Sequence, residues 1–180
     1  MADSTIYTLI SQEDVEKRVK EIGEQISKEY EGKDLHMVGI LKGSVYYMVE
    51  LAKHITCPMT MDFMSVSSYE NATSSSGVVR LIKDLDEPLE GRNVLVVEDI
   101  IDSGRTLSYL LELLSKRNPA SLKLTTLLDK PDRRVVQGVD VDYVGFVIPD
   151  EFVIGYGLDF EQHYRNLPYI GYFKQEESGE

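Results

Sequence analysis

Residues 94–107 read Val-Leu-Val-Val-Glu-Asp-Ile-Ile-Asp-Ser-Gly-Arg-Thr-Leu, and this stretch decides the fold. Its apolar start predicts a buried strand over Asn93–Val97, and Ser103-Gly104 predicts the turn that follows it. Leucines at three- and four-residue spacing then indicate one apolar face of a helix that stops before Pro119. A strand, a glycine turn and a helix in this order are typical of an α/β protein.

The same alternation of strands and helices continues on both sides of this stretch. Ser11-Gln12-Glu13-Asp14 resembles a capping box and predicts an amphipathic helix that ends at Gly32. A second, apolar helix is expected from the turn at Lys42-Gly43-Ser44 to about Ile55. Further strands are expected at Leu35–Leu41, Pro58–Ser68, Val78–Ile82, Leu122–Leu128, Tyr143–Ile148 and Phe152–Ile154. We therefore predict an α/β fold in one domain over residues 1–180, with a mostly parallel, twisted sheet flanked by helices on both faces.

Composition excludes several classes of protein. Nineteen basic against thirty-one acidic residues give the 180-residue chain a net charge of -12, which argues against nucleic acid and anionic membrane surfaces as partners. The single cysteine, Cys57, excludes an intrachain disulfide. No apolar run approaches the roughly 18–20 residues of a membrane span, and the first residues lack the pattern of a signal peptide. We expect a soluble protein of a reducing compartment, the cytoplasm.

The residues after the central strand indicate a site for a phosphorylated sugar. Ser103 to Thr106 can present backbone N–H groups and hydroxyls to a phosphate at the start of a helix. Three carboxylates lie just upstream and would repel a bare triphosphate, and no Walker-type phosphate loop is present. Glu98 and Asp99 can instead accept hydrogen bonds from sugar hydroxyls or approach a divalent cation, and Asp102 can exchange a proton with a group attached to the sugar. The plain alternative is solvated charges at a strand end followed by an ordinary turn.

The full string resembles the phosphoribosyl-pyrophosphate motif of the type I phosphoribosyltransferases, in which two acids, two hydrophobic residues, Asp, Ser or Thr and Gly follow a hydrophobic run. Other blocks are similar to the short bacterial hypoxanthine-guanine phosphoribosyltransferases, from about residue 5 to 172. These blocks are Leu41–Ser44, Leu128–Pro131, Val144–Phe146, Ile148–Asp159 and Tyr164-Arg165. The resemblance implies a core parallel sheet with a small hood built from N- and C-terminal segments. It also implies purine salvage, in which hypoxanthine or guanine and phosphoribosyl pyrophosphate give IMP or GMP and pyrophosphate.

The resemblance implies roles for residues along the sugar donor. Pyrophosphate is assigned to Lys42, Gly43 and Arg165, and the 5′-phosphate loop to Ser103, Gly104, Arg105, Thr106 and Leu107. Mg²⁺ is the implied cofactor, with Glu98, Asp99 and Asp159 as its ligands. The Leu41-Lys42 peptide bond can be cis in this family. Relatives often have Gly-Gly after the lysine where this chain has Gly43-Ser44. Without the resemblance, Lys42 would be an ordinary surface lysine.

A second set of roles concerns the base. The resemblance implies that Lys130 donates to the 6-oxo group of the purine, that Phe152 stacks on the ring, and that the Val153 backbone reaches the base edge. The resemblance also implies that Asp102 is the catalytic residue, which exchanges the proton of purine N7. Ser68 and Tyr69, with the Ser-rich segment 69–77, match a flexible lid. The alternatives are a surface lysine at Lys130, a core aromatic at Phe152 and an ordinary surface loop.

Two other functions compete with this hypothesis. A regulatory phosphoribosyl-pyrophosphate sensor would keep residues 98–106 but needs a partner-binding module, and Lys42, Lys130 and Arg165 favour catalysis. A transferase for another base is the second rival. Lys130 and the block at 148–159 argue against adenine and pyrimidines, because an amino donor on adenine would face a lysine donor. Xanthine stays open, as does the preference between hypoxanthine and guanine. Family habit implies a homo-oligomer, either a dimer or a tetramer.

Overall fold

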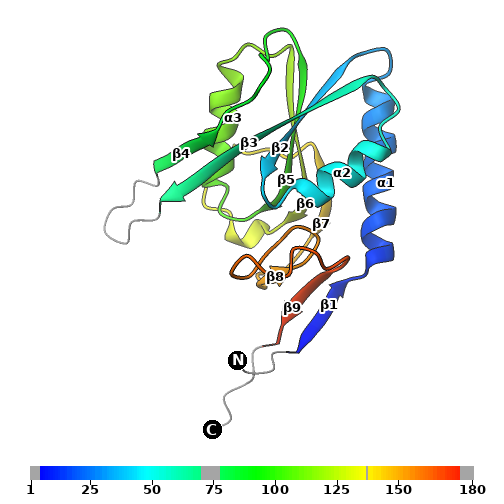
Figure 1. Cartoon of the computed structure of the whole chain (residues 1–180), viewed down its shortest axis with the longest axis vertical. Coiled ribbons are helices and arrows are strands. Elements are labelled where there is room, and N and C mark those ends of the chain that lie inside the picture. The colour runs from blue at the N-terminus through cyan, green and yellow to red at the C-terminus, as the bar shows by residue number, and fades with distance from the viewer. Residues whose placement is uncertain (1–4, 70–77, 137, 175–180) are drawn as a thin grey trace.

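The computed structural model describes residues 5–69, 78–136 and 138–174. Over these residues the chain forms a six-stranded sheet, and its strands lie side by side in the centre of Figure 1. In spatial order they are β4 (Val78–Lys83), β3 (Met59–Tyr69), β2 (Leu35–Leu41), β5 (Asn93–Ile101), β6 (Ser121–Asp129) and β7 (Tyr143–Val147). All neighbouring pairs are parallel except β3 with β4, which confirms the mostly parallel sheet.

Helices cover both faces of this sheet. The helices α1 (Gln12–Glu29) and α2 (Val45–Lys53) lie on one face, and α3 (Arg105–Ser115) lies on the other (Figure 1). Side chains alternate across a strand, so Leu95 and Val97 of β5 pack with α1 and α2 while Val94 and Val96 pack with α3. All four side chains are buried, and the central strand is therefore apolar on both faces.

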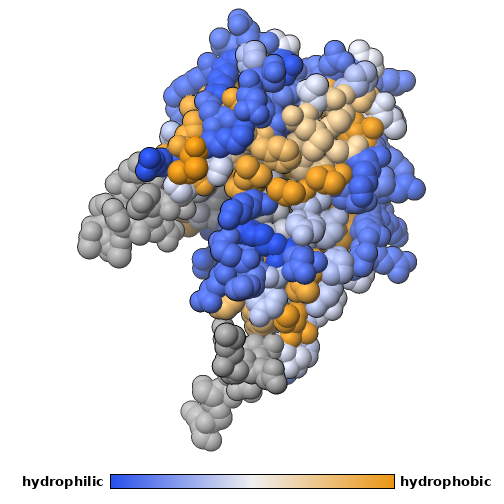
Figure 2. All heavy atoms as spheres, viewed as in Figure 1, coloured by the Kyte–Doolittle hydropathy of each residue, from blue (hydrophilic) through white to orange (hydrophobic). Residues whose placement is uncertain are grey.

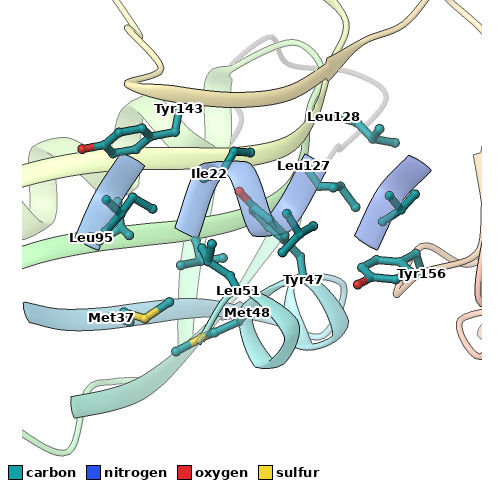
Figure 3. Close-up of a cluster of buried hydrophobic side chains, with 14 of the residues drawn as sticks. Ile22, Met37, Tyr47, Met48, Leu51, Leu95, Leu127, Leu128, Tyr143 and Tyr156 are labelled. Carbon is teal, nitrogen blue, oxygen red and sulfur yellow. The ribbon is translucent and has the colours of Figure 1, made fainter. Parts of the chain in front are cut away.

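The larger hydrophobic cluster lies beneath α1 and α2 (Figure 3). Ile22 of α1 and Leu51 of α2 meet Leu95 of the sheet there, and each is fully buried. Tyr47 is also fully buried and its hydroxyl hydrogen-bonds with that of Thr125 across 2.5 Å. This bond satisfies a polar group that would otherwise be costly in the interior.

The predicted hood is a second, three-stranded antiparallel sheet in the order β1 (Ile6–Ile10), β9 (Ile170–Phe173) and β8 (Val153–Ile154). It lies at one end of the main sheet and is the lowest part of the fold in Figure 1. The sequence-based strands did not include β1 or β9, although the N- and C-terminal segments were expected to form the hood. These short segments are strands through their pairing, β1 with β9 and β9 with β8.

One boundary of the central strand was predicted wrongly. The strand β5 continues through Ile101 instead of ending at Val97, because it keeps pairing with β6 as far as Asp129. Its pairing with β2 does end at Val97. Glu98 and Asp99 therefore belong to the strand, at the point where one of its two neighbours has turned away.

The surface over α2 and β3 carries exposed apolar side chains. Hydrophobic residues gather over these two elements in Figure 2, and Tyr46, Val49 and Met61 are among the large apolar residues that stay exposed. Among the described residues, no helix is long and apolar enough to cross a membrane.

Candidate active site

The predicted site residues come together at the carboxyl ends of the parallel strands. Lys42 and Gly43 follow β2, Asp102 follows β5, Lys130 follows β6, and Phe152 lies in the segment between β7 and β8. Since β2, β5, β6 and β7 are neighbours in that order, these segments lie along one edge of the sheet. This edge is where open α/β sheets bind their ligands.

Three segments lie in close contact at one end of this edge, through a backbone–backbone contact and a contact between backbone and side chain. A Cβ atom on Gly43 would overlap the carboxylate of Asp99, and a Cβ on Gly157 would overlap the carbonyl group of Gly43. Gly157 therefore requires glycine for space, because the obstacle is backbone, and it also has a positive φ of 100°. A Cβ on Gly43 would instead force the Asp99 side chain to move. The Leu41-Lys42 peptide bond is cis, as the resemblance implied.

The segment after Gly157 places a cation beside Lys42. Arg165 donates to the carbonyl of Gly157 at 2.7 Å and pairs with Asp159 at 2.7 Å. The Oε1 atom of Gln162 accepts from both Lys42 Nζ and Arg165 at 3.2 Å. Lys42 and Arg165, 123 positions apart in the sequence, thus share one acceptor, and together they can bind an anion such as pyrophosphate.

The acidic pair of β5, Glu98 and Asp99, could hold a cation. Glu98 and Asp99 are partly buried, and burial together with the charge of Asp99 raises the pKa of Glu98 well above its ordinary value. Bringing two carboxylates together out of water is unfavourable, and a divalent cation beside them would relieve that repulsion.

The carboxylate of Asp159, the third predicted metal ligand, already accepts from donors of the protein. Its carboxylate accepts from Arg165 at 2.7 Å and from the backbone N–H of Gln162 at 2.8 Å. Within the described ranges, no three His, Cys, Asp or Glu side chains form a group that could hold a metal. The pair Glu98 and Asp99 fits Mg²⁺, which usually takes one or two carboxylates and completes its shell with water and substrate phosphates.

The phosphate loop ends in the N-terminus of α3. Gly104 caps the helix with a positive φ of 79°, and Arg105 is exposed while Leu107 is buried in the core. Only the backbone N–H of Leu107, and not its side chain, can therefore donate to a phosphate. The first N–H groups of a helix have no partner within it, so Arg105, Thr106 and Leu107 supply donors at this point.

Two arginines that the sequence analysis did not single out support this loop. Arg134 packs its aliphatic stem against Gly104, so that a Cβ on the glycine would lie 2.9 Å from Arg134 Cδ, and it pairs with Asp129 at 2.5 Å. Arg133 Nε donates to Asp102 Oδ1 at 3.1 Å, and this contact raises the pKa of Arg133. The only sequence signal for either residue is its position, two or three residues after the block Leu128–Pro131.

The side chains predicted to bind a base lie at the other end of the same edge. Lys130 is only 7% exposed, so it is not a surface lysine, and its Nζ lies 4.0 Å from Asp150 Oδ1. Phe152 is 58% exposed and meets the ring of Phe160 edge to face, so it is not a core aromatic. Val153 is buried in β8, which leaves its backbone as the group that can reach a ligand.

The predicted lid lies only partly within the described residues. Ser68 and Tyr69 end β3, where their backbones pair with Val79 and Val78 of β4. Residues 70–77 lie outside the described residues.

Comparisons with known proteins agree with this geometry. A model of the phosphoribosyl transferase domain matches residues 8–161. The chain is 55% identical over 168 residues to the hypoxanthine-guanine phosphoribosyltransferase of Lactococcus lactis, covering 93% of this chain and 91% of that protein. It is equally similar to the bifunctional protein TilS/HprT of Listeria monocytogenes, of whose length it spans about a quarter (26%). The crystal structure of a hypoxanthine phosphoribosyltransferase from Staphylococcus aureus is similar with a TM-score of 0.89 at 50% identity, covering 93% of this chain and 91% of that one.

Proposed function

The chain belongs to the phosphoribosyltransferase family, and from that premise we propose that it transfers 5-phosphoribose from phosphoribosyl pyrophosphate to hypoxanthine or guanine. In this reaction a bond forms between purine N9 and C1′ of the ribose, and the bond from C1′ to pyrophosphate breaks. The observation that carries the proposal is the burial of Lys130 directly against the loop of Asp102. The backbone N–H of Lys130 donates to Ile101 O at 3.0 Å, next to Asp102 in the chain.

Lys130 accounts for the choice of an oxopurine. A lysine ammonium has only donors, so it satisfies a 6-oxo group and leaves a 6-amino group facing another donor. Because Lys130 is buried, an unsatisfied pairing there costs more than it would at the surface. Phe152 offers an exposed ring on which the purine would stack.

The remaining residues bind the sugar donor and handle the proton. The N-terminus of α3 binds the 5′-phosphate, and Lys42, Gly43 and Arg165 bind the pyrophosphate. Asp102 takes the proton that leaves N7 as N9 forms its new bond. Glu98 and Asp99 would hold Mg²⁺. The ion would neutralise the charge that develops on the leaving pyrophosphate.

The homo-oligomer that the resemblance implies is also a proposal. The exposed apolar side chains over α2 and β3 support it, since assembly with further copies would cover them. Size-exclusion chromatography with light scattering distinguishes monomer, dimer and tetramer.

Product analysis tests the proposed reaction. Hypoxanthine or guanine with phosphoribosyl pyrophosphate and Mg²⁺ should yield IMP or GMP and an equal amount of pyrophosphate. Excess chelator should abolish turnover and added Mg²⁺ should restore it, because the charge on pyrophosphate must be neutralised before it leaves. Full turnover in chelator would contradict the roles of Glu98 and Asp99, and absence of nucleotide in every condition would contradict the function.

A further inference from the structure

The catalytic carboxylate has a partner that the proposed reaction leaves unexplained. Asp102 Oδ1 accepts from Arg133 Nε at 3.1 Å, and Arg133 Nη1 lies 3.6 Å from Asp150 Oδ2. Asp150 is in turn 4.0 Å from Lys130 Nζ. The four side chains form a row of alternating charge that runs from the proton-transfer group to the lysine proposed to bind the base.

Backbone hydrogen bonds fix the two partners relative to each other. Ile101 O accepts from Lys130 N at 3.0 Å, and Ser103 O accepts from Val135 N at 3.1 Å. These bonds lie on either side of Asp102 in one segment and on either side of Arg133 in the other. Arg133 also ends the short helix η1 (Pro131–Arg133), the yellow-green coil in Figure 1.

Stability does not explain the contact between Asp102 and Arg133. Their side chains are 45% and 54% exposed, and exposed ion pairs contribute about 0–1 kcal/mol to folding. A carboxylate in water at a loop would otherwise sample several rotamers, and each rotamer that points away from the purine is unproductive. A cation held in a fixed position selects among those rotamers.

We infer that Arg133 is a positioning residue, which orients the Asp102 carboxylate for the N7 proton while Asp150 holds the other arm of its guanidinium. The inference rests on the proposed function, because Asp102 must carry the proton for its orientation to matter. Arg133 acts only through Asp102 in this account and contacts no substrate.

The inference is tested by steady-state kinetics on five enzymes with hypoxanthine and phosphoribosyl pyrophosphate. They are the unaltered protein, Arg133→Ala, Arg133→Lys, Asp102→Asn and the double variant Asp102→Asn/Arg133→Ala. A sixth, Lys116→Ala, is the matched control, because it removes one surface cation that pairs with Glu112 at the far end of α3.

Arg133→Ala should lower kcat roughly ten- to a hundredfold, since misplacing a reacting group costs rate. The KM for phosphoribosyl pyrophosphate should stay near its normal value, because Arg133 does not touch the sugar donor. Arg133→Lys should recover part of the loss, and Lys116→Ala should behave like the unaltered protein. Asp102→Asn should lower kcat by about 10²–10⁴. Removing Arg133 in that background should change kcat by less than about twofold, because coupled residues are not additive.

Three results would overturn the inference. Normal kcat in Arg133→Ala would remove Arg133 from the mechanism and leave the proposed function standing. If Arg133→Ala lowers kcat by the same factor in the unaltered protein and in Asp102→Asn, Arg133 acts independently of Asp102. Normal kcat in Asp102→Asn would overturn both the inference and the assigned role of Asp102. Thermal melting of each variant shows whether a loss comes from unfolding.

Discussion

Lys130 combines burial with charge, and such a residue needs a partner. Its side chain is 9% exposed, and in the described part of the chain the carboxylate within ion-pair distance of its Nζ belongs to Asp150, at 4.0 Å. That distance is at the outer limit of an ion pair, so the ammonium retains capacity to donate to a ligand. A buried donor that is not fully satisfied favours a ligand oxygen strongly over a ligand amino group.

Replacing Lys130 by alanine should weaken binding of the base and not of the sugar donor. An unmade hydrogen bond to a buried polar group costs about 1–3 kcal/mol, so affinity for hypoxanthine and guanine should fall roughly ten- to a hundredfold. Calorimetric titration of base and of phosphoribosyl pyrophosphate measures the two separately, with Lys116→Ala as control. Unchanged binding of both oxopurines would show that Lys130 does not hydrogen-bond with the base.

At the scale of elements, the turn at Gly43 and the turn at Gly157 are in close contact. The turn after β2 and the segment from Gly157 to Arg165 approach so closely that a Cβ on Gly157 would overlap the backbone of Gly43. Lys42 and Arg165, which we propose bind pyrophosphate, belong to these two segments. Their spacing is therefore set by backbone contact and not by the flexible side chains alone.

Substituting Gly157 by alanine tests this dependence. The methyl group would displace the turn at Gly43, so the KM for phosphoribosyl pyrophosphate should rise by about tenfold or more. Gly91→Ala is the matched control, since Gly91 also has a positive φ (71°) but a Cβ there would meet nothing within 4 Å. Backbone strain should cost each variant about 1–2 kcal/mol of stability, and Gly157→Ala should lose more because its methyl group also overlaps the Gly43 carbonyl. An equal rise in KM in both variants would show that backbone strain causes the effect, and not the contact with Gly43.

The sequence predicted the elements well where a pattern was local. The strand Leu35–Leu41 and the cap of α1 at Ser11 were predicted correctly, since apolar periodicity and capping chemistry act over a few residues. The predicted end of β5 was wrong because the last part of the strand forms by pairing with β6, and the residues of β5 alone do not show that pairing.

The candidate site was predictable as far as the family motif reaches. Lys42, Asp99 and Arg165 were named from sequence, and they lie in segments that the fold brings together. Arg133, Arg134 and Gln162 were missed, because an exposed arginine or glutamine in a charged loop has no distinguishing neighbours in sequence. Only the fold shows which carboxylate each of the arginines meets.

At the scale of the whole molecule, the hood and the main sheet share one hydrophobic cluster. Ile170 of β9 is fully buried and belongs to the cluster that includes Leu95 of β5 and Leu51 of α2. Because their apolar surfaces are buried together, we expect the two sheets to unfold together as one domain.

Ile170→Ala should therefore destabilise the entire protein. Loss of a buried isoleucine side chain costs about 2–5 kcal/mol, and the urea midpoint should fall while the transition stays single. Far-UV circular dichroism and tyrosine fluorescence should report the same midpoint. Val147→Ala, at a 67% exposed position of β7, should change stability by less than about 0.5 kcal/mol. Two separate transitions, with only the first one shifted by Ile170→Ala, would show that the hood folds on its own.

The most direct test of the central claim is a comparison of initial rates with hypoxanthine, guanine, xanthine, adenine and uracil at saturating phosphoribosyl pyrophosphate and Mg²⁺. A site built around a buried lysine donor should turn over hypoxanthine and guanine, and its kcat/KM for adenine should be lower by about 10⁴ or more. Uracil should give no nucleotide. Turnover of adenine or uracil at rates comparable with hypoxanthine would contradict the account.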